Sequence, residues 1–161
     1  MNCAITYCSP SGNTKQLAEK INEKLSDNLY FGQHDDKALE ADRLYIGFWT
    51  DKGTCDQKTI DFLSKVHGKE IFLFGTAGYG GEQEYFDKIL ERVKTVVPQD
   101  NTIIGGFMCQ GKMPQGIRAR YVKMKEENPD VAEKMDMMIE NFDKALNHPN
   151  EQDENMLLGM I

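Results

Sequence analysis

Residues 3–14 read CAITYCSPSGNT, and this stretch decides the fold. Its first part, Cys3 to Tyr7, is a largely apolar run typical of a buried strand. The segment after it, Lys15 to Leu25, has apolar residues at helical spacing. Between them lies a turn of small hydroxyl residues with Gly12 and Asn13. A strand, a short turn and a helix start bring backbone N–H groups together where the helix dipole favours an anion. The stretch therefore predicts a phosphate cradle.

Two common uses of such a turn do not fit these residues. A nucleoside triphosphate loop needs a Gly-Lys-Ser/Thr sequence, and none follows the turn. A small tyrosine phosphatase needs a Cys nucleophile, five residues and then an Arg that holds the phosphate. Cys8 is present, but Thr14 stands where that Arg is required, and Lys15 follows it. The turn is thus expected to hold the phosphate of another kind of ligand.

The rest of the chain alternates apolar runs with helical patterns, which predicts an α/β fold with helices on both faces of a parallel sheet. Residues 1–161 are expected to form a single domain in which 147–161 are a polar, then apolar, C-terminal tail. The predicted architecture is a three-layer sandwich with a five-stranded parallel sheet in the order 2-1-3-4-5. Beyond the first strand and helix, we expect strands near 28–31, 43–49, 70–76 and 102–109, and helices over 56–66, 82–96, 117–127 and 129–146.

In such a sheet, ligands bind beyond the carboxyl ends of the strands, where the strand order reverses. The loops after the first, third and fourth strands should meet there. The second of these loops begins with the only tryptophan, Trp49, and the third is rich in glycine around Tyr79. These two aromatic residues are predicted to stack on the faces of a flat ring. The candidate binding residues are Ser9, Ser11, Gly12, Asn13 and Thr14 in the turn, Trp49, Thr50, Asp51, Lys52 and Gly53 in the second loop, and Thr76, Ala77, Gly78, Tyr79 and Gly80 in the third.

The turn resembles the FMN-phosphate loop of the flavodoxins, a Thr/Ser-x-Thr/Ser-Gly-Asn-Thr run directly after the first strand, which residues 9–14 match in order. The resemblance implies a flavodoxin-like fold, FMN as cofactor, and a carrier that shuttles electrons between a reductase and an acceptor enzyme, with no catalytic residue of its own. The overall sequence character is similar to that of the small BilS-type members, which implies a role beside a bilirubin-reducing enzyme. Flavin loops in this family are usually acidic. Lys52 departs from that pattern, and a cation at the ring would raise the redox potential.

Two other functions stay open at this point. One is an NAD(P)H-dependent flavin or quinone reductase of flavodoxin-like fold, in which Lys112, Arg118 and Arg120 would bind an anionic substrate. Whether the protein is an enzyme is therefore uncertain. The other is a binding module that has lost the flavin.

Composition excludes several other classes of protein. The net charge is −7 and the pI is about 5.0, so there is no overall basic field for nucleic acid, and an acidic surface suits basic redox partners. No apolar run has the length of a membrane span and no signal peptide is recognisable, so we expect a cytoplasmic protein without a membrane partner. The four cysteines and three histidines are scattered, which predicts neither a metal site nor a disulfide framework.

Overall fold

The computed structural model describes all 161 residues and is built around one parallel sheet. Its strands lie in the order β2-β1-β3-β5-β6, and the short strand β4 pairs antiparallel with the end of β3. With β4 counted apart, this is the predicted order 2-1-3-4-5, and the predicted fold class is confirmed. The strands are β1 (Cys3–Tyr7), β2 (Tyr30–Gln33), β3 (Arg43–Asp51), β4 (Thr54–Cys55), β5 (Glu70–Ala77) and β6 (Thr102–Gln110).

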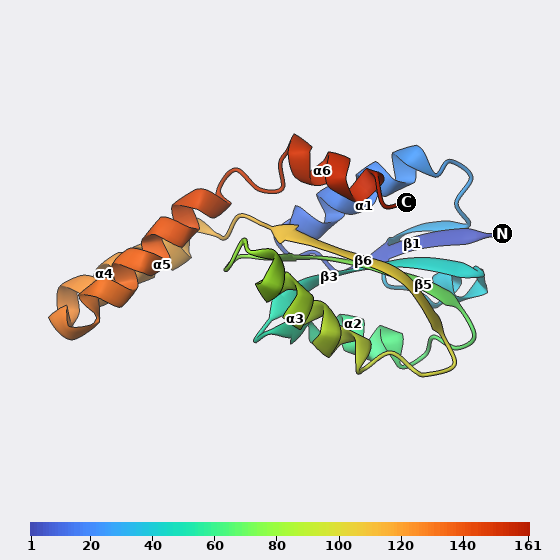
Figure 1. Cartoon of the computed structure of the whole chain (residues 1–161), viewed down its shortest axis with the longest axis horizontal. Coiled ribbons are helices and arrows are strands. Elements are labelled where there is room, and N and C mark those ends of the chain that lie inside the picture. The colour runs from blue at the N-terminus through green and yellow to red at the C-terminus, as the bar shows by residue number, and fades with distance from the viewer.

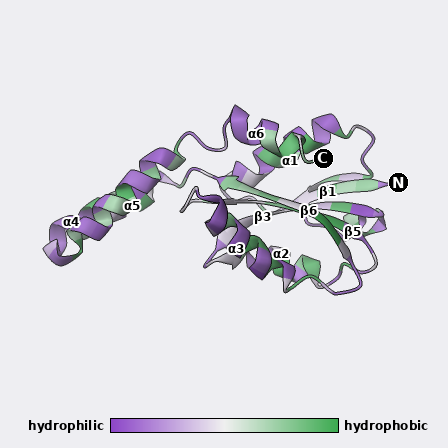
Figure 2. Cartoon of the chain, in the orientation of Figure 1, coloured by the Kyte–Doolittle hydropathy of each residue, from purple (hydrophilic) through white to green (hydrophobic).

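Helices cover both faces of the sheet (Figure 1). One face is covered by α1 (Asn13–Lys24) and α6 (Glu151–Leu158), and the other by α2 (Gln57–Leu63) and α3 (Gln83–Lys94). A short 3-10 helix, η1 (Asp36–Glu40), follows β2. Each face has its own apolar core, of 19 buried residues on the α2/α3 side and 11 on the α1/α6 side. Figure 2 shows the apolar residues gathered in the strands and hydrophilic residues along the outer helices. This double burial explains why the central strands read as nearly continuous apolar runs.

The chain after β6 differs from the expectation. The predicted helix over 129–146 is in fact a 3-10 turn, η2 (Pro129–Val131), followed by α5 (Ala132–Ala145). With α4 (Gln115–Glu127), α5 forms a helical hairpin that projects away from the sheet (Figure 1). The expected tail contains α6, which begins with a capping box between Asn150 and Asp153. It lies beside α1 with Leu157 fully buried. Along the chain, the hairpin thus lies between β6, the last strand, and α6, the helix that completes one layer.

The central strands β3 and β5 approach each other through glycines. A Cβ atom on Gly75 would lie 2.4 Å from the Phe48 ring, and one on Gly47 would lie 2.6 Å from the Phe74 ring. The two rings therefore occupy space that only glycine leaves free, directly below the ends of the strands that carry the candidate loops. Among the helices, none combines the length and apolar character needed to cross a membrane.

Candidate functional site

The turn between β1 and α1 has the form of an anion site. Gly12 adopts φ +87°, a left-handed conformation that glycine reaches at little cost. The Ser9 hydroxyl accepts a hydrogen bond from the Lys15 amide at 3.0 Å. The amides of Asn13 and Thr14, the first two of α1, have no acceptor within the chain. Two free N–H groups at a helix N-terminus are what a phosphate requires.

Thr14 contributes differently from the expectation based on sequence. Its side chain is fully buried, and its hydroxyl donates to the carbonyl oxygen of Phe48 at 2.9 Å. The same hydroxyl lies 3.0 Å from the Thr76 hydroxyl. The Thr14 side chain therefore ties α1 to β3 and β5, and only its backbone N–H is left for a ligand.

Asn13 joins the turn to the loop that follows β6, the last strand of the sheet. Its side-chain amide donates to the Ser11 hydroxyl at 3.1 Å and to the carbonyl oxygen of Lys112 at 2.8 Å. Its own Oδ1 is buried and has no hydrogen-bond partner. The loop after β6 is thereby fixed against the turn, and one buried polar atom beside the turn remains unsatisfied.

Beside the turn lies a cleft of about 570 Å³, here called the main cleft, within the range of small-molecule sites. Of the predicted residues, ten line it, from all three loops: Ser11, Asn13, Trp49, Thr50, Lys52, Gly53, Thr76, Ala77, Gly78 and Tyr79. Five predicted residues do not line it: Ser9, Gly12, Thr14, Asp51 and Gly80. The sequence-based expectation that the three loops meet at one edge thus agrees with the geometry.

The walls of the main cleft suit a flat ring. Trp49 and Tyr79 both line it, and Tyr79 is 50 % exposed and meets Tyr85 edge to face, with ring centroids 5.7 Å apart. The Thr50 hydroxyl, in the same wall, is buried without a hydrogen-bond partner. An anion site at one end, aromatic walls and an unsatisfied hydroxyl fit a ligand that carries a phosphate and a flat polar ring. FMN is such a ligand.

The second loop is the tip of a tight hairpin between β3 and β4. Lys52 and Gly53 have φ values of +54° and +84°, the pair of left-handed residues found in type I′ turns. The Gly53 carbonyl accepts a hydrogen bond from Arg92 at 3.0 Å, which holds the tip in place. Lys52 and Lys112 are the charged residues that line the main cleft, and no carboxylate does. The cleft is therefore cationic in a chain whose net charge is −7.

Sequence analysis missed a fourth wall of the main cleft. It comes from the loop after β6 and the base of the hairpin, where Met113 packs so closely on Gly78 that a Cβ there would lie 2.6 Å from it. Asn141 of α5 donates to the Gly78 carbonyl at 2.9 Å and accepts from Gln110 at 3.1 Å. The lining residues outside the predicted cofactor site are Pro10, Tyr85, Gly111, Lys112, Met113, Pro114 and Ile117. Of these, only Lys112 was singled out from the sequence, as part of the anionic-substrate site of the reductase alternative. The Gly/Pro composition after β6 and the cations that follow it were the available signals.

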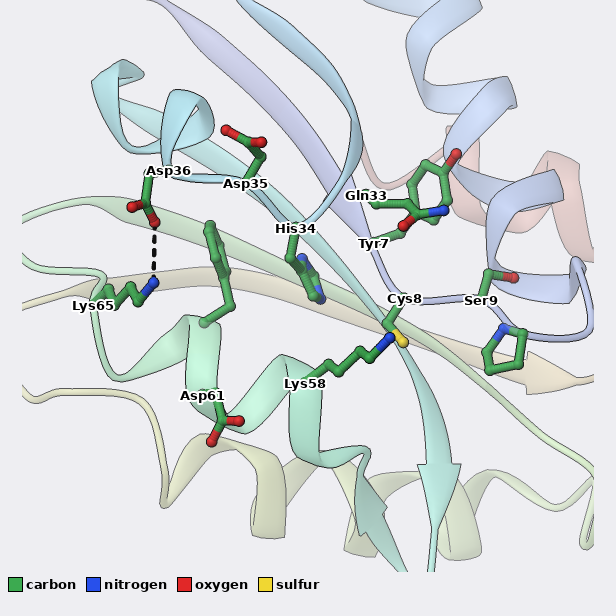
Figure 3. A pocket seen from close by; sticks show the side chains of 12 residues that line it. Tyr7, Cys8, Ser9, Gln33, His34, Asp35, Asp36, Lys58, Asp61 and Lys65 are labelled. Carbon is green, nitrogen blue, oxygen red and sulfur yellow. Dashed lines mark hydrogen bonds and ion pairs between the residues drawn. The ribbon is translucent and has the colours of Figure 1, made fainter.

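A second cleft of about 470 Å³ lies on the other side of the turn, between β2 and α2 (Figure 3). Here the His34 ring lies 2.8 Å from the Thr59 hydroxyl, 2.9 Å from the Thr6 hydroxyl, and stacks on Phe62. Because Thr59 donates to Asp56, His34 Nε2–H donates to Thr59 and Nδ1 accepts from Thr6. Burial lowers the pKa of His34 to about 4, although the charge of Asp56 acts in the opposite direction.

Cys8 borders the same cleft, close to the Lys58 amine (Figure 3). Burial, and then a hydrogen bond to Asp56, raise the pKa of the Cys8 thiol to about 11, while Lys58 acts weakly in the opposite direction. A cysteine nucleophile acts as its thiolate, and this thiol is protonated at neutral pH. The protonated thiol and the missing Arg both disfavour phosphatase chemistry.

A doubly wound sheet with a phosphate turn after its first strand and an aromatic cleft at the reversal of strand order defines a flavodoxin-like protein. The chain belongs to the flavodoxin family, since residues 4–160 match the model of the Flavodoxin domain. It is 40 % identical to the flavodoxin-like domain-containing protein BilS of Clostridium symbiosum (strain WAL-14163) and 33 % identical to BilS of Clostridioides difficile (strain CD3). Each alignment covers 95 % of this chain and 90 % of the relative. The similarity to BilS-type proteins is thereby confirmed.

Solved structures agree on the fold. Two-electron reduced flavodoxin from Megasphaera elsdenii matches with a TM-score of 0.50 and 21 % identity, over 71 % of this chain and 89 % of its own. A flavoprotein from Lactobacillus acidophilus NCFM in complex with FMN matches with a TM-score of 0.50 and 17 % identity, over 67 % of this chain and 93 % of its own. The two alignments span most of each solved protein but leave about a third of this chain unmatched.

Proposed function

We propose that this protein is an FMN-binding electron carrier that receives electrons from a reductase and delivers them to a partner oxidoreductase. The observation that carries the proposal is the main cleft, which joins the free amides of a phosphate turn to aromatic walls at the predicted edge of the sheet. Bound FMN supplies the redox chemistry. Because this chain resembles BilS, we propose that the acceptor is a bilirubin-reducing enzyme.

The chain's own residues hold and orient the cofactor. The amides of Asn13 and Thr14, with the Ser11 hydroxyl, would bind the phosphate. Trp49 and Tyr79 would flank the ring, and the half-exposed position of Tyr79 leaves the ring edge accessible to a partner. No Asp, Glu, His or Cys side chain lines the main cleft, and its titratable side chains are Lys52, Lys112, Tyr79 and Tyr85. An accessible ring edge supports a carrier that passes electrons to a partner protein.

A titration of the apoprotein with FMN tests the proposal. We expect one FMN to bind per chain and its fluorescence to be quenched, because Trp49 and Tyr79 contact the ring. Riboflavin, which lacks the phosphate, is expected to bind more weakly. A protein that neither binds FMN nor quenches its fluorescence would overturn the proposal.

The reductase alternative has one observation in its favour. The hairpin adds a wall beside the cofactor position, with Lys112 lining the cleft and Arg120 exposed on α4. These cations are suited to the phosphates of a nicotinamide dinucleotide. Rapid oxidation of NADH or NADPH by the FMN-loaded protein alone would favour this enzyme, whereas an electron carrier turns over slowly until a separate reductase is added.

Replacing Lys52 by Glu is expected to lower the midpoint potential of bound FMN. Lys52 lines the main cleft, and its positive charge stabilises the more negative reduced flavin. At an effective dielectric constant near 20, one charge across a cleft contributes about 1–2 kcal/mol. That corresponds to about 20–40 mV per unit of charge for a two-electron couple, so the change of two units from Lys to Glu is expected to lower the potential by about 40–80 mV. Spectroelectrochemical titration measures the shift, and Lys69→Glu, at the opposite edge of the sheet, is the control. Equal potentials in the parent and Lys52→Glu would show that Lys52 does not act on the ring.

A further inference from the structure

The hairpin of α4 and α5, residues 115–145, packs almost entirely on itself. No residue of α4 is buried, and Met124 on α4 and Met137 on α5 are 42 % and 62 % exposed. The hairpin is fixed to the domain at its base, where the Asn141 amide binds the Gly78 carbonyl and the Lys112 amide binds the His148 carbonyl. It is therefore a rigidly anchored element whose sides are free.

One side of α4 continues the wall of the main cleft. Ile117 lines the cleft, and Arg120 and Met124 follow it by three and seven residues. Residues at these spacings share one side of a helix. The stripe of half-buried Ile117 and exposed Arg120 and Met124 therefore leads outward from the cofactor position along the hairpin, which projects beyond that edge of the sheet (Figure 1).

The first three turns of α4 carry only positive charge. Residues 115–125 contain four cationic side chains and no acidic one. Arg118 and Lys125 form ion pairs across the hairpin with Asp143 and Asp136. Lys123 pairs with Glu127, one turn further along α4. Arg120, by contrast, has no acidic partner, and neither do Lys52 and Lys112 at the main cleft. Exposed apolar side chains rimmed by unpaired cations are typical of a protein docking surface.

We propose that Tyr79, Lys112, Ile117, Arg120 and Met124, here called the docking face, bind a redox protein through an acidic patch on that partner. The inference rests on the proposed function and names the chemistry of its partner. A protein seated against the hairpin lies over the main cleft, beside the exposed edge of the ring. The overall charge of −7 predicted basic partners, but at physiological salt a charge acts over only about 8–10 Å. The local cations at the cleft therefore decide which partner docks.

Two electron acceptors of opposite charge test the docking face. The FMN-loaded protein is reduced and mixed with cytochrome b5, which is acidic, or with cytochrome c, which is basic, at low and high ionic strength. We expect the rate with cytochrome b5 to fall as salt is added. We also expect Arg120→Glu/Lys123→Glu, which reverses Arg120 of the docking face and the exposed Lys123 beside Met124 on α4, to lower that rate about tenfold at low salt and to raise the rate with cytochrome c.

Lys69→Glu/Lys94→Glu is the matched control, because it reverses two charges at the opposite edge of the sheet. It should leave both rates near those of the parent, and FMN affinity should be the same in all three proteins. Unchanged rates in the hairpin variant would overturn the proposal of a docking face. A parent protein that is dimeric, and a hairpin variant that is monomeric, would also overturn it, because a second copy of the chain would then cover the docking face. Binding to immobilised cytochrome b5 without FMN is measured in parallel. This measurement separates failure of docking from failure of the cofactor proposal.

Discussion

Ser11→Asp is expected to abolish tight FMN binding while leaving riboflavin binding nearly unchanged. Ser11 lines the main cleft at the phosphate turn and is exposed. A carboxylate there would face the phosphate dianion at close range, and two like charges about 4 Å apart repel by about 4 kcal/mol at an effective dielectric constant of 20. We therefore expect FMN affinity to fall at least about 100-fold, which corresponds to about 3 kcal/mol. Riboflavin has no phosphate, so its affinity reports on the ring site alone.

Calorimetric titration of both flavins provides the measurement. The fold should tolerate the change, because Asp is favourable at a helix N-terminus and Asn13 can donate to it as it does to Ser11. Ser26→Asp, an exposed site just beyond the other end of α1, is the matched control and should bind FMN like the parent. Equal weakening of FMN and riboflavin by Ser11→Asp would show that the turn does not hold the phosphate.

The features that sequence predicted correctly depend on neighbours in the chain. The turn of residues 9–14 combines its strand, its left-handed glycine and its helix start within a dozen residues. The buried strands read as apolar runs because helices cover both faces. Once these elements are known, the handedness of parallel connections leaves few possible strand orders. The meeting of the three loops at one edge followed from that order.

The features that sequence missed depend on distant contacts. The apolar spacing of α5 is the same whether the helix packs on a sheet or on another helix, so periodicity could not reveal that the hairpin projects. Its bond from Asn141 to Gly78 joins residues 63 positions apart. The direction of the Thr14 hydroxyl likewise depends on Phe48 and Thr76, which come from two other strands. Such contacts arise only when the layers assemble.

The hairpin and the phosphate turn are also linked to each other. Asn13 binds the backbone at Lys112, and Asn141 binds the backbone at Gly78, so the base of the hairpin contacts both ends of the main cleft. The loops that line the main cleft thus also hold the base of the hairpin in place. The proposed cofactor site and docking face are in this way parts of one connected structure.

Acidification is expected to destabilise the fold through His34. Burial holds the pKa of His34 at about 4 in the folded state, against 6.5 in the unfolded chain. Between these values the unfolded state binds a proton that the folded state does not, so the free energy of unfolding falls as the pH is lowered from about 6.5 to about 4. A difference of this size corresponds to about 3 kcal/mol. Above pH 6.5 His34 is neutral in both states and contributes no pH dependence.

His34→Gln isolates this contribution, because a glutamine side chain can donate to Thr59 and accept from Thr6 without titrating. Urea unfolding of both proteins is measured from about pH 7 to about pH 4. The carboxylates titrate alike in the two proteins, so the parent should lose about 3 kcal/mol more than His34→Gln over this range. Parallel curves would mean that His34 has the same pKa in the folded and unfolded states, and burial would then contribute no pH dependence.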